Sequence, residues 1–340
     1  MSASLSSLHF TDLYFPVDGS EARMKGLSAT PRYQAVPPEY AAHARDLLAA
    51  VQRQYGRQGA EHEATSRSFG ADQRFFAVEF ERVRYRVTLV GGRDGDAGAT
   101  WAIRKPLWPL PALSELGIPS GLVARVLDFA GGNRGGLLLV VGPFGSGKTT
   151  MSSLLAREVA IVLGQFVLGW SDPPELAIDG DYPGGGWVRQ YDRRDEELAD
   201  AIYEARRSSA DVFYIGEIRS PSGAAAAVQA ALNGRPVLTT LHGGDLVAGI
   251  TALETYASRS GGEQTRTLVA EALAGAVRTD LQYLPDGGRA LKVSDAFFCE
   301  EASGCAFREA VRRGMLEALP RLAQHGHADL GLGPRPRSGR

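Results

Sequence analysis

The sequence lacks a charge imbalance, and this argues against one broad class of partner. Its 340 residues include 37 Lys and Arg against 39 Asp and Glu, which gives a formal net charge of −2. Such a chain creates no overall positive field to attract nucleic acid or anionic lipid. From composition we therefore expect no direct nucleic-acid partner.

Long hydrophobic runs and cysteine are also scarce. No apolar stretch approaches the roughly 20 residues that a membrane-spanning helix requires. The first residues, Met1 to Leu5, show neither the charged region nor the apolar core of a secretory signal. The two cysteines, Cys299 and Cys305, are too few for a disulfide framework or a four-ligand zinc site, so we expect ordinary thiols. These absences predict a soluble cytoplasmic protein with no transmembrane segment.

What the chain does contain is a phosphate-binding motif. Residues 142–149 read Gly-Pro-Phe-Gly-Ser-Gly-Lys-Thr, a full match to the pattern G-x-x-x-x-G-K-[ST]. In this motif backbone N–H groups cradle phosphate oxygens, the lysine adds charge near the β- and γ-phosphates, and the hydroxyl can hold Mg²⁺. The apolar run 137–141 before it predicts a buried parallel strand, and helical spacing over 151–163 predicts a helix ended by Gly164.

A strand, a glycine loop and a helix in this order predict a site for a nucleoside triphosphate, because the helix dipole adds to the anion site. We expect the cofactors to be ATP and Mg²⁺. The expected nucleotide-binding residues are Gly142, Pro143, Phe144, Gly145, Ser146, Gly147, Lys148, Thr149 and Thr150.

Three further segments place polar residues where predicted strands end. The apolar run 211–215 is followed by Glu217, which can hold Mg²⁺ through water or deprotonate the attacking water. The run 236–241 ends at His242, which could sense the γ-phosphate or be merely structural. After residues 166–168, Asp172 and Glu175 could support a metal, but a proline turn with solvated charges explains them equally well. The candidate metal ligands are Thr149, Asp172 and Glu217.

The N-terminal third looks like a separate unit. Residues 8–15 are strand-like, 40–55 show helical spacing after Pro37–Pro38, and two alternating runs at 76–80 and 83–89 predict paired strands. The phase of the alternation changes at Glu81–Arg82, as expected for a tight turn, so Arg84 and Arg86 project from one face. A glycine-rich loop at 91–98 then precedes a strand that carries Arg104.

Composition and alternation divide the rest of the chain. Four prolines between residues 105 and 120 break regular structure and indicate a linker. We expect a small α+β domain over 1–110, a linker over 111–134, an α/β domain with a parallel sheet over 135–325, and a disordered tail over 326–340.

Taken together, these blocks resemble the PilT/GspE-type ATPases that drive type IV pili and bacterial secretion systems. That family follows the P-loop with an acidic "Asp box", a Walker B segment ending in Gly-Glu, and a "His box" reading Thr-Leu-His. Here the corresponding residues are 142–149, 171–175, 215–219 and 240–242. The segment 84–87 also resembles the family's R-[FY]-R-V strand.

The resemblance implies a RecA-like ATPase domain with a smaller PAS-like N-terminal domain, assembled as a homo-hexameric ring. It implies partners in an inner-membrane platform or secretion apparatus. Catalysis would use Lys148, Glu217 and His242, and an arginine finger drawn from Arg84, Arg86, Arg93 and Arg104 would act at subunit junctions.

Two departures from the family pattern refine this reading. The Asp box begins with Ser171 where the family usually has Glu, so hydrolysis could be slower or could depend on Glu217 alone. The four-cysteine zinc module of extension-type members is absent, which favours a retraction-type or compact DotB-like member.

The leading hypothesis is therefore an ATP-hydrolysing ring motor of a pilus or secretion system, cytoplasmic and peripheral to the inner membrane through its partners. A RecA-like nucleic-acid motor and a nucleotide-gated, non-hydrolysing assembly subunit remain as alternatives.

Overall fold

The computed structural model describes residues 4–8, 10–26, 33–64, 75–91, 98–132, 134–261, 264–283, 289–299, 305–324 and 327–332. It divides into two compact units. The first comprises Met1–Leu110 and Glu175–Ala177, and the second comprises Pro111–Pro174 and Ile178–Arg340.

The first unit is a six-stranded antiparallel sheet with one long helix, α1 (Ala41–Ala64). The strand order is β3-β2-β1-β6-β5-β4. The strands are β1 (Asp12–Pro16), β2 (Arg23–Lys25), β3 (Tyr33–Ala35), β4 (Phe75–Phe80), β5 (Val83–Val90) and β6 (Thr100–Arg104). A short 3₁₀ turn, η1 (Pro38–Tyr40), precedes α1. Strand β1 begins later than the strand-like pattern at 8–15 suggested.

The predicted hairpin at Glu81–Arg82 is confirmed. Phe80 pairs with Val83 across the turn, and both turn residues have positive φ, 52° and 64°. Two successive left-handed residues match the right-handed twist of the flanking strands. Along β5, Val83, Tyr85 and Val87 are buried, whereas the residues between them are partly exposed. The alternation read from the sequence therefore corresponds to the two faces of this sheet.

The second unit contains an eight-stranded sheet in the order β14-β13-β7-β12-β11-β8-β10-β9. The six central strands, β13 to β10, run parallel, and β14 and β9 are antiparallel to their neighbours. The strands are β7 (Gly136–Gly142), β8 (Phe166–Ser171), β9 (Gly180–Asp181), β10 (Trp187–Asp192), β11 (Val212–Ile215), β12 (Pro236–His242), β13 (Leu273–Tyr283) and β14 (Arg289–Phe298). This arrangement confirms the predicted α/β fold with a parallel sheet.

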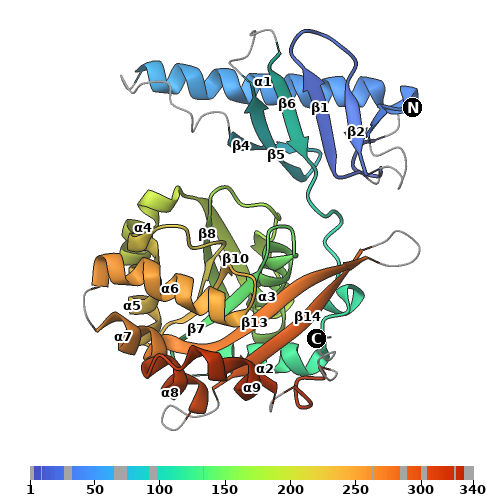
Figure 1. Cartoon of the computed structure of the whole chain (residues 1–340). Helices are drawn as coiled ribbons and strands as arrows, with labels where there is room; N and C mark the ends of the chain where they lie inside the picture. Colours follow the sequence, from blue (N-terminus) through green and yellow to red (C-terminus); the bar gives the residue numbers. More distant parts are fainter. Residues whose placement is uncertain are drawn as a thin grey trace. The chain divides into compact units, whose positions relative to one another are not determined.

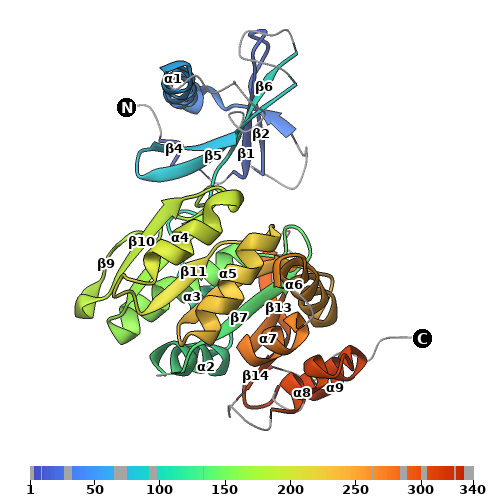
Figure 2. The ribbon, with the colours of Figure 1, turned by 90° about the vertical axis from the view of Figure 1, so that its left-hand side faces the viewer.

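Helices cover both faces of this sheet (Figures 1 and 2). The α-helices are α2 (Ser120–Gly131), α3 (Lys148–Leu163), α4 (Leu198–Ala205), α5 (Pro221–Leu232), α6 (Leu246–Gly261), α7 (Thr265–Ala272), α8 (Ala306–Arg312) and α9 (Leu319–Gln324). Short 3₁₀ turns are η3 (Leu113–Leu116), η4 (Pro183–Gly185), η5 (Asp195–Glu197) and η6 (Leu316–Ala318).

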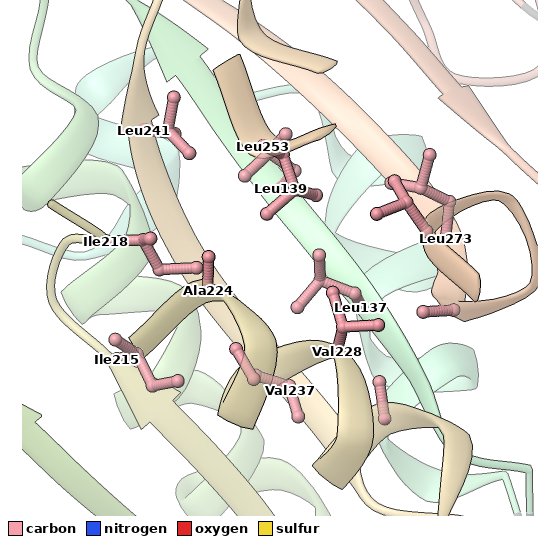
Figure 3. Close-up of a cluster of buried hydrophobic side chains, with 14 of the residues drawn as sticks. Leu137, Leu139, Ile215, Ile218, Ala224, Val228, Val237, Leu241, Leu253 and Leu273 are labelled. Carbon is pink, nitrogen blue, oxygen red and sulfur yellow. The ribbon is translucent and has the colours of Figure 1, made fainter. Parts of the chain in front are cut away.

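The main core lies between the sheet and helices α4 to α9, and Figure 3 shows part of it. Leu137 and Leu139 of β7 point into it and meet Val228 of α5 and Leu253 of α6. On the central strand β7 every residue is buried, because helices lie on both faces. Burial of this kind stabilises a parallel sheet by roughly 25 cal/mol for each Å² of apolar surface removed from water.

Three expectations from the sequence require correction. The stretch 111–134 is not an extended linker, since it carries η3 and α2, and α2 packs on α3 in the second unit. Residues 327–332 of the expected tail pack against the fold: Leu330 is buried, and Nε2 of His327 lies 2.8 Å from Oδ1 of Asp295. Residues 333–340 lie outside the described part. Cys299 and Cys305 form a disulfide, because the end of β14 and the start of α8 bring their Cα atoms within 5.5 Å.

Candidate active site

The predicted site residues gather at one edge of the parallel sheet. The register pairs His242 at the end of β12 with Gly142 at the end of β7. It also pairs Ile215, the last residue of β11, with Trp170 of β8 and Thr239 of β12. Because the carboxyl ends of parallel strands meet at the same edge, the segments that follow these strands become neighbours.

The P-loop conformation depends on its glycines, as Gly147 and Gly142 show. Gly147, the N-cap of α3, has φ of 87°, which side chains other than glycine rarely adopt. A Cβ at Gly142 would meet the Ser146 hydroxyl and the backbone oxygen of Thr279. Helix α3 begins at Lys148, so its first N–H groups and the positive end of its dipole face the loop. The backbone is thus shaped for an anion.

Lys148 is buried in the loop that it serves. Its Nζ donates to the backbone oxygens of Gly142 and Pro143, each at 3.0 Å, and lies 3.2 Å from Nδ1 of His242. Burial lowers the pKa of the Lys148 ammonium, and the nearby Glu217 carboxylate opposes that shift. The ammonium is therefore held inside the loop by backbone oxygens of the loop itself.

Glu217 lies between two cationic or donor groups. Its Oε1 is 2.7 Å from Nε2 of His242, and its Oε2 is 2.6 Å from both Nε and a terminal nitrogen of Arg219. The Glu217 side chain is only 15% exposed, against 50% for His242 and 49% for Arg219. The carboxylate is thus less exposed than its two partners, and it lies within a short chain of contacts from Arg219 through Glu217 and His242 to Lys148.

The backbone around Glu217 is held from both sides. The amide of Gly216 donates to the Trp170 oxygen at 2.8 Å, and the amide of Ile218 donates to the Thr240 oxygen at 3.1 Å. The buried Thr240 hydroxyl donates to the Gly216 oxygen at 2.6 Å. These bonds fix the turn after β11, so neighbouring strands hold the backbone from which the Glu217 side chain extends.

His242 is held in one tautomer by its partners. An ammonium can only donate, so Nδ1 facing Lys148 accepts, and Nε2 carries the proton that is donated to Glu217. Burial lowers the pKa of His242; Glu217 opposes this, and Lys148 and Arg219 act in the same direction as burial. A neutral imidazole therefore bridges the P-loop lysine and the carboxylate.

Asp172, another proposed metal ligand, is less directly connected to the contacts between Glu217, His242 and Lys148. Asp172 follows β8, and burial raises the pKa of its carboxyl group, while the positive charge of Arg219 opposes the shift. Among the residues that the structure describes, no group of three or more His, Cys, Asp or Glu side chains could hold a metal ion by itself. Thr149 lies on the first turn of α3, and Thr150 follows it.

The candidate arginines belong to the first unit. Arg84 and Arg86 lie on the same face of β5 as predicted. Arg86 forms an ion pair with Glu175, which clusters with that unit. Nε of Arg104 is 2.8 Å from Oδ1 of the buried Asp12, so Arg104 has a structural partner within the sheet. Arg93 lies outside the described residues.

A family comparison agrees with this arrangement. The model of the type II/IV secretion system protein family matches residues 82–319. The chain belongs to this family. The predicted PilT/GspE-type relationship is thereby confirmed. None of the helices that the structure describes has both the length and the apolar composition needed to cross a membrane.

Relatives of this secretion-family chain come from several systems. The type II secretion system protein HxcR of Pseudomonas aeruginosa is 39% identical over 142 residues, which cover 42% of this chain and 29% of HxcR. A twitching motility protein of Neisseria gonorrhoeae is 24% identical over 256 residues, 74% of this chain and 64% of that protein. The chain spans only 20% to 29% of the length of three type II secretion proteins that it matches.

Solved structures show the same fold. The Legionella pneumophila ATPase DotB superposes with a TM-score of 0.64 at 19% identity, covering 92% of this chain and 84% of DotB. The pilus retraction motor PilT with bound ADP gives 0.66 at 22% identity, covering 95% of this chain and 90% of PilT. The predicted RecA-like architecture of the secretion-family chain is confirmed by these likenesses.

Sequence reasoning assigned no role to two contacts at this site. Arg219 was visible two residues after Glu217 in the Gly-Glu-Ile-Arg string, and that short spacing was the available signal. Phe144 was expected to bind nucleotide only as part of the loop motif, yet its ring stacks on His242. No pattern in the sequence could have indicated that pair, because residues 144 and 242 meet only through the pairing of β7 with β12.

Proposed function

We propose that this chain is an ATP-hydrolysing motor that acts as a homo-hexameric ring and powers a type IV pilus or a type II/IV secretion machinery. The observation that carries the proposal is the chain of contacts from Lys148 through His242 to Glu217 at the P-loop. In a member of this family, that contact chain connects the P-loop lysine, through His242, to a carboxylate that is only 15% exposed.

ATP would be bound mainly by the loop and by α3. The nine residues Gly142 to Thr150 would surround the phosphates, with backbone N–H groups as donors. Lys148 would exchange its bonds to the Gly142 and Pro143 oxygens for bonds to the β- and γ-phosphates.

A magnesium ion fits the same residues. Mg²⁺ commonly keeps several waters and takes few protein ligands beside substrate phosphates. The Thr149 hydroxyl would be a direct ligand, and Glu217 and Asp172 would act through water. When bound, the ion neutralises charge on the β- and γ-phosphates.

Glu217 would be the general base. Its side chain is only 15% exposed, so the carboxylate is largely shielded from bulk water, and its orientation is set by His242 and Arg219. A carboxylate held in this way can take a proton from the attacking water. His242 would transmit the movement of Lys148 toward phosphate to Glu217, because the imidazole contacts both.

The hexameric ring and its partner proteins are proposed from the similarity to relatives. HxcR is a type II secretion protein and PilT a pilus retraction motor by their names. By analogy, Arg84 and Arg86 would supply a finger to a neighbouring subunit, since guanidinium stabilises charge on a transferring phosphoryl group. The motor would be cytoplasmic, a retraction-type or DotB-like member, and held at the inner membrane by platform proteins.

Phosphate release from Mg²⁺-ATP by the purified full chain tests the activity, with size measured by light scattering with and without nucleotide. We expect turnover in a hexameric fraction and none after chelation of Mg²⁺. Nucleotide uptake without turnover would instead support the gated assembly subunit. Turnover that requires single-stranded DNA would support the nucleic-acid motor. Calorimetry that detects no adenine nucleotide binding would overturn all three.

A further inference from the structure

Phe144 is an exposed aromatic residue at the tip of the P-loop. It is 82% exposed, more than any other large apolar residue in the part of the chain that the structure describes. An aromatic ring in water contributes little to a core, so burial does not account for this residue. Its position follows from the loop, because Pro143 restricts the backbone before it and Gly145 after it has φ of 74°.

The ring of Phe144 lies against His242. The two ring centroids are 6.0 Å apart and the planes differ by 14°, which is an offset stacked arrangement. The residues come from adjacent strand ends, since His242 pairs with Gly142 and the amide of Gly243 donates to the Gly142 oxygen at 3.3 Å. The stack therefore joins the tip of the P-loop to the end of β12.

The stack constrains the orientation of the His242 ring, on which both of its contacts at this site depend. Half of the His242 side chain is exposed, so rotation about its side-chain bonds is not prevented by packing in a core. Its nitrogens must nevertheless face opposite partners, Nδ1 toward Lys148 at 3.2 Å and Nε2 toward Glu217 at 2.7 Å. The Phe144 ring lies nearly parallel to the imidazole and so favours the ring orientation in which both contacts form at once.

We propose that Phe144 is a positioning residue that holds the His242 imidazole between Lys148 and Glu217. Its influence on turnover rests on the proposed function, whereas its influence on His242 does not. Stacked aromatic pairs are typically worth a factor of about 2 to 12 in an equilibrium. We therefore expect replacement of the ring to lower kcat by about that factor, with little change in KM.

The first experiment observes His242 directly in nucleotide-free protein. The full chain is labelled with [¹³C]histidine, the His242 signal is assigned by its loss in His242→Gln, and all samples are measured at one pH. The ring current of Phe144 should displace the His242 ring signals upfield. Phe144→Leu should remove this displacement and Phe144→Tyr should retain it, because only the latter keeps a ring.

The matched control is Tyr203→Leu on α4. Tyr203 is also exposed, at 65%, and its ring contacts Arg206 rather than His242. The same aromatic-to-leucine change there should leave the His242 signals unmoved. If Phe144→Leu leaves them unmoved as well, Phe144 does not position His242 and the inference is overturned.

The second experiment is a double-mutant cycle on turnover. Phe144→Leu should lower kcat in the parent chain but have little further effect in a His242→Gln background, since residues that act through one contact are not additive. Phe144→Tyr should restore kcat. An equal loss in both backgrounds would show that Phe144 acts independently of His242. Absence of ATPase activity in the parent, with the ring-current result intact, would reject the proposed function but not the positioning contact.

Discussion

Oε1 of Glu217 lies 2.7 Å from Nε2 of His242, across the neighbouring ends of β11 and β12. The two side chains belong to segments that the crossover helix α5 separates, and they meet because the strands pair in parallel register. The direction of the candidate base is therefore set by a residue on another strand.

Replacing Glu217 with Gln should leave ATP binding nearly intact and lower hydrolysis by about 10² to 10⁴-fold. The amide keeps the shape and one acceptor but cannot take a proton from water. Calorimetric binding and phosphate release measure the two effects separately. Glu197→Gln, at an exposed position near the start of α4, is the matched control. Loss of binding in the Glu217 variant would mean that this residue mainly holds metal or structure.

Lys148→Ala should lower turnover by about 10²-fold or more, because the charge that stabilises the phosphates is removed. It should also weaken ATP binding and free Nδ1 of His242. Lys292→Ala, at an exposed position on β14, is the control for loss of one positive charge. Turnover retained by the Lys148 variant would remove this residue from the mechanism.

Arg219 should orient Glu217 rather than bind nucleotide tightly. Two of its nitrogens lie 2.6 Å from one Glu217 oxygen, and lysine, a single point charge, cannot reproduce that fork. We expect kcat to fall in the order parent, Arg219→Lys, Arg219→Gln, by about 1.5- to 5-fold at each step, because Arg219 is half exposed and such ion pairs are worth about 0.2–1 kcal/mol. A variant faster than the parent would indicate that Arg219 restrains Glu217 in an inactive state.

Arg84→Ala and Arg86→Ala should lower activity only in the assembled ring. If these arginines act across subunits, mixing an arginine variant with Glu217→Gln should restore part of the activity, since some junctions then contain one intact finger and one intact base. Phosphate release from titrated mixtures tests this directly. An equal loss in an isolated protomer would argue against a finger acting between subunits.

Glu254 on α6 gives a prediction about pH and stability. Burial raises the pKa of this carboxyl group, and Arg266, with Nε at 3.4 Å, opposes the shift. The folded chain therefore holds the Glu254 proton more tightly than the unfolded chain does, so this residue's contribution to stability falls as pH rises above the unfolded value.

Glu254→Gln cannot titrate, so its Tm relative to the parent should increase from pH 4 toward pH 7. Scanning calorimetry at several pH values measures that difference. Glu317→Gln, at an exposed site, is the control. A Tm difference that is constant over this range would contradict a raised pKa at Glu254.

Much of the second unit could be predicted because its signals are local. The predicted helix after the P-loop is α3, and Gly164 ends it with φ of 65°. Helix α5 also has a local start signal, because Ser220 caps it by accepting a hydrogen bond from the Gly223 amide. Strands read from short apolar runs appear as β7, β8, β11 and β12. Periodicity and glycine positions carry this information within a few residues.

Predictions from composition were less successful. Prolines between 105 and 120 suggested a linker through 134, but α2 follows Pro119 directly as a helix can. The two cysteines looked independent, yet the path from β14 to α8 brings them together. Leu330 is buried although its neighbours suggested disorder. In each case the packing partner comes from another segment, and composition does not show which segments lie close together in the folded chain.

By itself, the sequence determined the order of elements, the P-loop and the residues that end each strand. These features depend on hydrophobic periodicity and on glycine positions, which are local along the chain. Only the tertiary structure decided that Phe144 stacks on His242 and that Arg219 shares Glu217 with the same imidazole. The physical reason is register. Hydrogen bonds between β7, β12 and β11 align strand ends that lie far apart in the chain, and the side chains at those ends acquire their partners from that alignment.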